Sequence, residues 1–366
     1  MVNPFKGPSF LRTFGLVLLA IAVLFTADTF LANAERAESL AGAARLFQQG
    51  QALMQRGDNA QAIERIQDAL AIERGNRDYL RMLAQAQFAA GKTSDAESTL
   101  TELLQSNPTD GLASLVMGRV LVKEGRFAEA ISYLHRAIYG DWKEDAAGNR
   151  LRARFELIDL LAGRNSKQEL LAELIAVQDH IPPDLERKRG RLFLLAGSPA
   201  RAAEVFRGIL QDAPEDADAI AGLGEAEFAR GNYREAERHF QTALRLAPDN
   251  QAARQRLDLC NEVLTLDPTM RGIGPTERFR RSRRLVELTV GETTQCIGQN
   301  ASAEVQGLLD EAGKALKAHV SAVQQSEASE SNLDLAEELW QARKQECKSP
   351  PATDGPLGLV MARLAQ

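Results

Sequence analysis

The stretch that decides the fold runs from Gly222 to Asn250 and reads GLGEAEFARGNYREAERHFQTALRLAPDN. Apolar residues recur there at three- and four-residue spacing in two segments, a pattern typical of two amphipathic helices. Gly231 separates the two segments, and Pro248 follows the second, where it ends a helix. Gly224 and Ala236 are small residues at positions where a helical core usually has large ones. This pattern predicts a helix hairpin whose two axes approach closely.

The same pattern recurs along the chain with a spacing of 34 residues. The glycines between segments form the series Gly57, Gly91, Gly125, Gly163, Gly197 and Gly231, with four extra residues between Gly125 and Gly163. Two series of small residues accompany it: Gly50, Ala84, Gly118, Gly190 and Gly224, and Ala62, Ala96, Ala130, Ala202 and Ala236. We expect left-handed backbone at Gly57, Gly91, Gly125, Gly197 and Gly231. Members of the two small-residue series are expected to face each other across each hairpin.

These residues resemble the signature of the tetratricopeptide repeat family. The matching positions are Leu223, Gly224, Gly231, Tyr233, Ala236, Phe240, Ala243 and Pro248. The resemblance implies an all-α fold, a right-handed superhelical solenoid of αα-hairpin repeats. The repeat pattern stops after Pro268, and a small C-terminal helical module is expected there. Hairpins of this kind stack because one alone cannot bury its apolar face.

The expected repeats cover residues 43–76, 77–110, 111–144, 183–216 and 217–250, with a cap helix at 251–266. A degenerate repeat is expected at 149–182, where Gln168 replaces the alanine of the series. The insertion near residues 141–149 precedes it, which predicts a splayed unit and a bend or hinge. The expected domains are thus an N-terminal segment (1–34), the solenoid (35–268) and the C-terminal module (269–366).

The N-terminal segment has the pattern of a membrane-targeting element. Lys6 and Arg12 precede an uncharged run over residues 13–27, and a helix continued to Ala34 spans roughly 33 Å, enough for a ~30 Å hydrocarbon core. We expect a single inner-membrane helix with the rest of the chain exported. One alternative is a signal sequence cleaved after Ala34, which leaves a soluble periplasmic protein. A buried core helix is the other.

The C-terminal module is expected to hold helices at 276–297, 302–325 and 331–347, followed by an irregular proline-rich stretch at 349–356 and a short apolar segment at 357–366. An up-down-up packing would bring Cys296 close to Cys347, and an oxidising compartment would then favour a disulfide between them. Two unrelated thiols are the alternative. Cys260 is expected to be a small buried residue.

A basic run near the start of this module comprises Arg278, Arg280, Arg281, Arg283 and Arg284. Such a run can bind anionic lipid, an acidic glycan or an acidic partner. The alternative is a solvated helix face whose arginines pair with Glu277 and Glu287. A formal net charge of -6 argues against nucleic acid as a partner.

No pattern for catalysis or for a metal or cofactor emerges from the sequence. Gly91-Lys92-Thr93 ends like a phosphate-binding loop, but Ala86 stands where that motif needs glycine, and Gly91 belongs to the repeat series. The four histidines, His135, His180, His239 and His319, lack metal-ligand spacing. We therefore expect no catalytic residues, no metal, no cofactor and no enzymatic activity.

The family's geometry implies a concave groove lined by the first helix of each repeat. The candidate residues are Arg81, Gln85, Phe88, Arg119, Lys123, Arg187, Arg191 and Leu194. This set predicts a mildly basic groove for an acidic or extended apolar peptide. Some relatives hold a terminal carboxylate with lysine and asparagine, and that constellation is not reproduced here. The alternative is that the arginines only solvate a curved surface.

The whole pattern predicts a non-enzymatic scaffold that binds another protein of the cell envelope. The arrangement resembles bacterial envelope-assembly proteins with one N-terminal helix followed by these repeats, although the paired C-x-x-C motifs of their rubredoxin-like zinc modules are absent. The alternative is a glycan- or lipid-binding assembly factor that acts through the C-terminal module, with the repeats as a docking arm. Self-association through the repeats is a third hypothesis.

Overall fold

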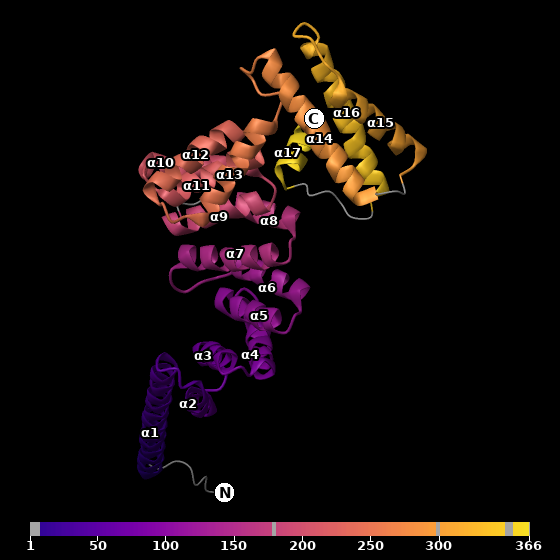
Figure 1. Ribbon diagram of the computed structural model, residues 1–366. Helices are drawn as coiled ribbons and strands as arrows, with labels where there is room; N and C mark the ends of the chain where they lie inside the picture. Colours follow the sequence, from indigo (N-terminus) through magenta and orange to yellow (C-terminus); the bar gives the residue numbers. More distant parts are fainter. Residues whose placement is uncertain (1–7, 178–180, 298–300, 348–353, 366) are drawn as a thin grey trace. The chain divides into compact units, whose positions relative to one another are not determined.

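The computed structural model describes residues 8–177, 181–297, 301–347 and 354–365, with side chains from Phe14 onward. Every regular element of these ranges is a helix, apart from an isolated bridge between Asp110 and Asp141. The all-α class is confirmed. The chain divides into two compact units, Met1–Gly163 (unit 1) and Arg164–Gln366 (unit 2), and we describe each by itself (Figure 1).

Unit 1 consists of three helix hairpins followed by a single long helix. Its helices are α1 (Pro8–Gln55), α2 (Asn59–Ile72), α3 (Arg77–Ala89), α4 (Thr93–Ser106), α5 (Gly111–Lys123), α6 (Phe127–Tyr139) and α7 (Ala146–Gly163). Each helix packs on the next one in the chain. The contact between α3 and α5 joins the first helices of neighbouring hairpins, as in a stacked array.

The apolar N-terminal segment and the first helix of the first repeat form one continuous helix, α1, of 48 residues. Residues 14–41 of α1 are exposed, and packing against α2 begins with the buried Ala43. The buried-core alternative is therefore wrong. Among the described residues, only the helix stretch Phe14–Gln55 is long and apolar enough to cross a membrane. Lys6 and the side chain of Arg12 lie outside the described part of the chain.

The turns inside the hairpins follow the glycine series. Left-handed φ values of +81°, +78°, +77°, +76° and +77° occur at Gly57, Gly91, Gly125, Gly197 and Gly231. In the degenerate repeat this position falls to Asn165, with φ 56°, whereas Gly163 is the last residue of α7. The turn of this repeat therefore lies two residues later than the glycine series predicts. It lies at an asparagine, which also tolerates a left-handed conformation.

The small residues create room for large ones. A Cβ atom on Gly50 would lie 2.6 Å from Ile66 Cγ1, and one on Gly224 would lie 2.8 Å from Phe240 Cε1. The alanines of the facing series are fully buried, but in the four repeats with glycine at this position the side chain that fills the space stands four residues after the alanine. The expected close approach is present, and it serves to seat a bulky residue between the two helices.

Unit 2 begins with the second helix of the degenerate repeat. Its helices are α8 (Lys167–Ile175), α9 (Pro183–Leu195), α10 (Pro199–Asp212), α11 (Ala217–Ala229), α12 (Tyr233–Leu246), α13 (Gln251–Leu266), α14 (Pro275–Ile297), α15 (Ala303–Lys317), α16 (Gln325–Glu346) and α17 (Pro356–Leu364). The border between the two units thus lies inside the degenerate repeat, between α7 and α8. The expected cap helix is α13.

The C-terminal helices share one apolar core with the end of the solenoid (Figure 1). Val263 and Leu266 of α13 lie in this core together with Leu285, Leu339 and Val360. The predicted division after residue 268 therefore runs between helices that fold together. α15 ends earlier and α16 begins earlier than the sequence pattern predicts.

An ion pair and a disulfide stabilise this end of unit 2. Arg363 Nη1 lies 3.0 Å from Oδ2 of the buried Asp267, which ties α17 to the end of α13. Cys296, at the end of α14, and Cys347, directly after α16, form a disulfide, the pairing expected from the sequence. Cys260 is a free, buried thiol whose pKa burial raises to about 12.

Candidate functional site

A pocket of about 460 Å³ opens in unit 1 between the first helices of successive repeats. Its lining residues are Phe88 of α3, Arg119, Val122 and Lys123 of α5, Leu134 of α6, and Glu156, Asp159 and Leu160 of α7. Four of the eight lining residues are apolar and four are charged, and most of the lining surface is apolar. A concave apolar site with a few placed charges is the usual form of a binding site in proteins.

Arg119 and Glu156 close one side of the pocket with a two-pronged ion pair. Arg119 Nε donates to Glu156 Oε2 at 2.8 Å, and Nη2 donates to Oε1 at 2.5 Å. The hydrogen bonds to Glu156 raise the pKa of Arg119 further. Since this geometry satisfies both carboxylate oxygens, Arg119 holds α5 against α7 and offers little free charge to a ligand.

Lys123 behaves differently, although it lies one helical turn from Arg119. Its side chain is exposed, and Nζ lies 5.7 Å from the centroid of the Phe88 ring. The structure shows no ion pair for Lys123 with any residue that it describes. The pocket therefore has one exposed ammonium group beside its aromatic wall.

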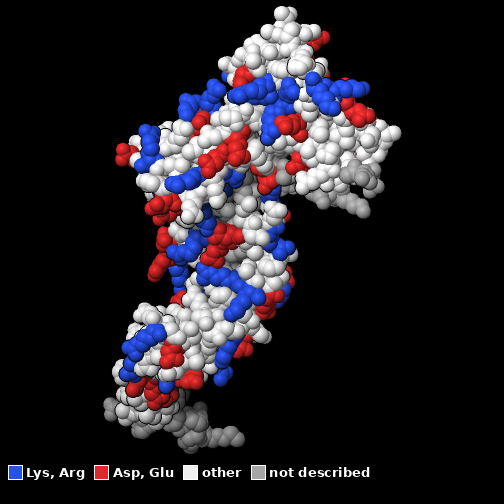
Figure 2. Space-filling view, viewed as in Figure 1, with Lys and Arg blue, Asp and Glu red and all other residues white. Residues whose placement is uncertain are grey.

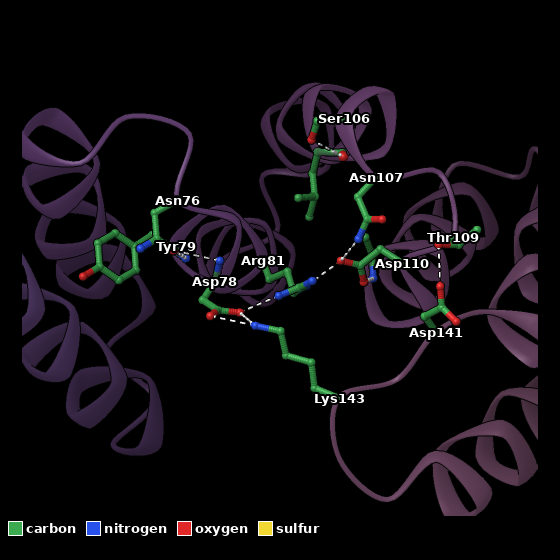
Figure 3. A network of polar contacts seen from close by, with 12 residues as sticks. Asn76, Asp78, Tyr79, Arg81, Ser106, Asn107, Thr109, Asp110, Asp141 and Lys143 are labelled. Carbon is green, nitrogen blue, oxygen red and sulfur yellow. Dashed lines mark hydrogen bonds and ion pairs between the residues drawn. The ribbon is translucent and has the colours of Figure 1, made fainter.

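Arg81 belongs to a separate network at the other end of α3 (Figure 3). Its Nε donates to Asp110 Oδ2 at 2.5 Å, and its guanidinium also pairs with Asp78. Asp110 caps α5 by accepting the Ala113 N–H at 3.0 Å. Lys143 Nζ reaches Asp78 at 2.6 Å from the inserted segment, and this bond lowers the pKa of Asp78. Arg81 is thus a structural residue that connects two repeats.

The inserted segment packs back onto the start of α5 instead of projecting away. Gly111 N–H donates to the carbonyl of Asp141 at 2.9 Å, and Asp141 N–H donates to the carbonyl of Thr109 at 2.7 Å. Trp142 Nε1 donates to the carbonyl of Ala137 at 2.9 Å, and its ring covers Gly111. We call residues 140–145 the strap. Within unit 1, these hydrogen bonds hold the insertion against the start of α5.

The candidate groove residues of unit 2 repeat part of this arrangement. Arg187 Nη1 donates to Asp216 Oδ2 at 2.6 Å, and Arg187 also pairs with Asp184. Arg191 is exposed, and Leu194 is half-buried. The expected basic character of the groove is therefore largely cancelled, because Arg81, Arg119 and Arg187 each face a carboxylate. Figure 2 shows Lys and Arg side chains interspersed with Asp and Glu on the face drawn.

Three of the eight candidate groove residues, Phe88, Arg119 and Lys123, meet in the pocket. Gln85 is half-buried on α3 and does not line it. The sequence analysis missed Glu156, Asp159 and Leu160, which form the facing wall. Their spacing on α7 is that of one helix face and could have indicated them, but the insertion obscured the alignment of α7 with the other repeats.

The basic run of α14 pairs mostly with neighbouring groups. Arg280 and Arg281 pair with Glu277, at 2.6 Å each, and lower its pKa to about 2, while Arg284 pairs with Glu287 at 2.5 Å. Arg281 also donates to the carbonyl oxygens of Leu264 and Asp267, and Arg283 donates to that of Leu316. These contacts are those of the solvated, locally paired face that the sequence left as an alternative.

Metal binding and phosphate binding find no support in the described geometry. No group of three or more His, Cys, Asp or Glu side chains in the described residues could hold a metal ion. His180 lies outside those residues. Gly91 and Lys92 form the turn between α3 and α4, and Thr93 begins α4, so this tripeptide is a repeat turn.

A stacked array of helix hairpins with a groove pocket defines the class of helical-repeat proteins. A family model described as tetratricopeptide repeat matches residues 53–120, 88–155 and 193–257. This chain is a tetratricopeptide repeat protein. Repeats of this family form protein-interaction scaffolds, and that is the functional class of the chain.

Curated relatives match part of the chain. A putative cellulose synthase operon protein C of Escherichia coli O157:H7 is 30% identical over 51% of this chain and 16% of its own length. The cellulose synthase operon protein C of Escherichia coli K12 is 29% identical over 56% of this chain and 18% of its own. The cellulose synthase operon protein C of Komagataeibacter xylinus is 26% identical over 43% of this chain and 12% of its own length. The chain thus spans less than a fifth of the length of these relatives.

Solved structures of repeat proteins are similar in fold. The C-terminal part of a tetratricopeptide repeat-containing protein of Cytophaga hutchinsonii has a TM-score of 0.48 at 14% identity, covering 66% of this chain and 95% of that one. PilW, a type IV pilus biogenesis factor, has a TM-score of 0.40 at 19% identity, covering 59% of this chain and 98% of that one.

Proposed function

We propose that this chain is a non-enzymatic scaffold that holds an extended segment of another protein in its repeats, at a membrane. The observation that carries the proposal is the pocket between α3, α5 and α7. It lies on the first helices of successive repeats, and three residues of the expected groove line it. An extended segment laid across these helices would place a side chain in the pocket.

The membrane part of the proposal rests on the continuity of α1. A cut after Ala34 would fall in the middle of a helix that runs without a break from Pro8 to Gln55. We therefore favour an uncleaved inner-membrane anchor, with the repeats on the exported side because Lys6 and Arg12 precede the apolar run. Intact-mass measurement of the membrane-extracted protein tests this proposal. Loss of the first 34 residues would establish the signal-sequence alternative.

The partner is proposed to be a component of a cell-envelope complex. The curated relatives named cellulose synthase operon protein C favour a complex that makes or exports a polysaccharide, although they match over only a small part of their length. This proposal concerns the setting of the scaffold and assigns no step of synthesis to it.

Site-specific photo-crosslinking in native membranes tests the scaffold proposal. A photoreactive amino acid at Val122, on the pocket rim, should give a discrete adduct with a partner protein. The same amino acid at Glu102, an exposed position on α4 away from the pocket, is the matched control and should give none. Equal adducts from both positions, or none from Val122, would refute the proposal. An adduct with a second copy of this chain would establish self-association instead.

Glycan or lipid binding through the C-terminal helices is the second candidate function. Deletion of residues 275–366 would expose the core shared with α13, so point substitutions make a cleaner test. Arg280 and Arg284 are exposed, and their ion pairs stay within α14. If Arg280→Ala with Arg284→Ala abolishes binding to anionic vesicles or to an acidic glycan, this candidate gains. We expect the double variant to leave binding to both probes unchanged, because these arginines are already paired.

A further inference from the structure

Each of the two walls of the pocket consists of three residues at positions i, i+3 and i+4 of a helix, two of them charged and one apolar. One wall consists of Arg119, Val122 and Lys123 on α5, and the other consists of Glu156, Asp159 and Leu160 on α7. Residues with this spacing lie on a single helix face. The walls therefore offer two places where a cation of α5 could meet an acid of α7.

Only the first of these places is closed. Arg119 and Glu156 form their two-pronged pair, whereas Lys123 extends toward Phe88 of α3 and makes no described ion pair. The apolar side chains of Val122, Leu134 and Leu160 line the same pocket. The pocket thus combines an apolar lining with one closed ion pair and one exposed cation.

The apolar lining and the position of Lys123 together describe a ligand. Resting on the proposed scaffold function, we infer that the pocket binds a bulky apolar side chain of the partner segment and that Lys123 pairs with an Asp or Glu side chain beside it. Burial of the apolar side chain against Phe88, Val122 and Leu160 supplies most of the affinity. The ion pair selects the partner and its direction along the groove.

The acid is an internal side chain of the partner, not its chain terminus. The lysine-and-asparagine constellation that holds a terminal carboxylate in some relatives is not reproduced here: the pocket lining contains no asparagine, Lys123 is its one exposed ammonium, and both prongs of Arg119 are engaged by Glu156. The segment therefore carries one acidic residue on the Lys123 side of its apolar residue.

Peptide selection against the full chain in mild detergent tests this inference. The probe is a phage library of random dodecapeptides fused through their C-termini, so that no peptide has a free carboxylate end. The wild type should select a large apolar residue adjacent to Asp or Glu. Lys123→Glu should replace the selected acid by Lys or Arg. The matched control is Arg191→Glu, an exposed charge reversal in unit 2, which should leave the wild-type consensus unchanged.

Affinities of the selected peptide then separate the two contributions. Lys123→Gln should weaken the acidic peptide about threefold to fivefold, the size of one exposed ion pair, and should leave its Glu→Gln analogue unchanged. Val122→Ser should weaken both peptides. Far-UV circular dichroism of each variant verifies that the helices remain folded.

The outcomes distinguish this inference from the scaffold proposal. Selected peptides whose affinity ignores Lys123 and Val122, or a consensus that appears only in a second library with free C-termini, would overturn the inference and leave the scaffold proposal standing. Failure of the wild type to select any peptide, from either library, would count against both.

Discussion

The same three-residue charge arrangement occurs in both units, at the same positions of repeats 77–110 and 183–216. In unit 1, Arg81 joins Asp78 to Asp110, the N-cap of α5. In unit 2, Arg187 joins Asp184 to Asp216, the N-cap of α11. Both arginines therefore tie the first helix of one repeat to the first helix of the next.

The two copies differ in burial, and the strap explains the difference. Lys143 reaches Asp78 in unit 1, whereas Asp184 has 89% of its side chain exposed against 53% for Asp78. Asp110 is 2% exposed and Asp216 12% exposed. The repeat pattern supplies the charge arrangement, and the insertion decides how far it is removed from water. An ion pair strengthens as water is excluded, so equal sequences need not have equal energies.

The largest effect should come from removing the shared N-cap carboxylate. Asp110→Ala leaves Arg81 without its buried partner and α5 without its cap, and we expect a loss of about 3 kcal/mol in the free energy of unfolding. Asp216→Ala should cost about 2 kcal/mol, since its surroundings are more exposed. Urea unfolding in mild detergent, followed by far-UV circular dichroism, measures both. Equal losses would break the comparison.

Gly111 and Ala217 provide the second test, because they are the first residues of α5 and α11. A Cβ atom on Gly111 would lie 2.5 Å from Trp142 Nε1, so Gly111→Ala should displace the strap and cost about 1–3 kcal/mol. Ala217→Gly should cost less than about 1 kcal/mol. The same unfolding experiment applies. A neutral Gly111→Ala would show that the strap moves aside without penalty.

Loss of Lys143 should make the unit 1 network resemble that of unit 2 at little energetic cost. The Lys143–Asp78 pair is exposed, so Lys143→Gln should cost less than about 1 kcal/mol. The readout is amide hydrogen exchange, which should accelerate across the strap and leave α11 unchanged. Exchange that accelerates equally in both units would indicate a global effect instead of a local release.

The smallest effect concerns pH and should be confined to unit 2. Burial lowers the pKa of His239, while Tyr133 occupies the same position of the repeat in unit 1. In the unfolded chain, His239 binds a proton near pH 6.5, whereas in the folded chain it remains neutral at that pH. Stability is therefore full above this pH and falls as the pH drops through the window between the two pKa values. Hydrogen exchange of α12 between pH 7.5 and 5.5 measures this pH dependence of stability, and His239→Gln should remove it.

Local backbone demands made the repeat architecture predictable. A left-handed turn favours glycine, a helix start favours aspartate or asparagine, and both recur at fixed intervals, so the hairpins and their turns follow from the residues. Asn165 shows the limit of that reasoning. Its backbone adopts the same left-handed conformation, and the glycine series therefore misplaced the turn of the degenerate repeat by two residues.

The sequence by itself determined the helix hairpins, their stacking and the apolar N-terminal run, because these depend on spacings within about 40 residues. Tertiary structure alone decided which charges remain free. Lys143 meets Asp78 across 65 residues, and Glu156 engages Arg119 across 37, so Arg119 is neutralised while Lys123 stays exposed. Spacing along a helix shows which residues share a face. Only the packing of the helices shows which opposite charge lies close to each of these residues.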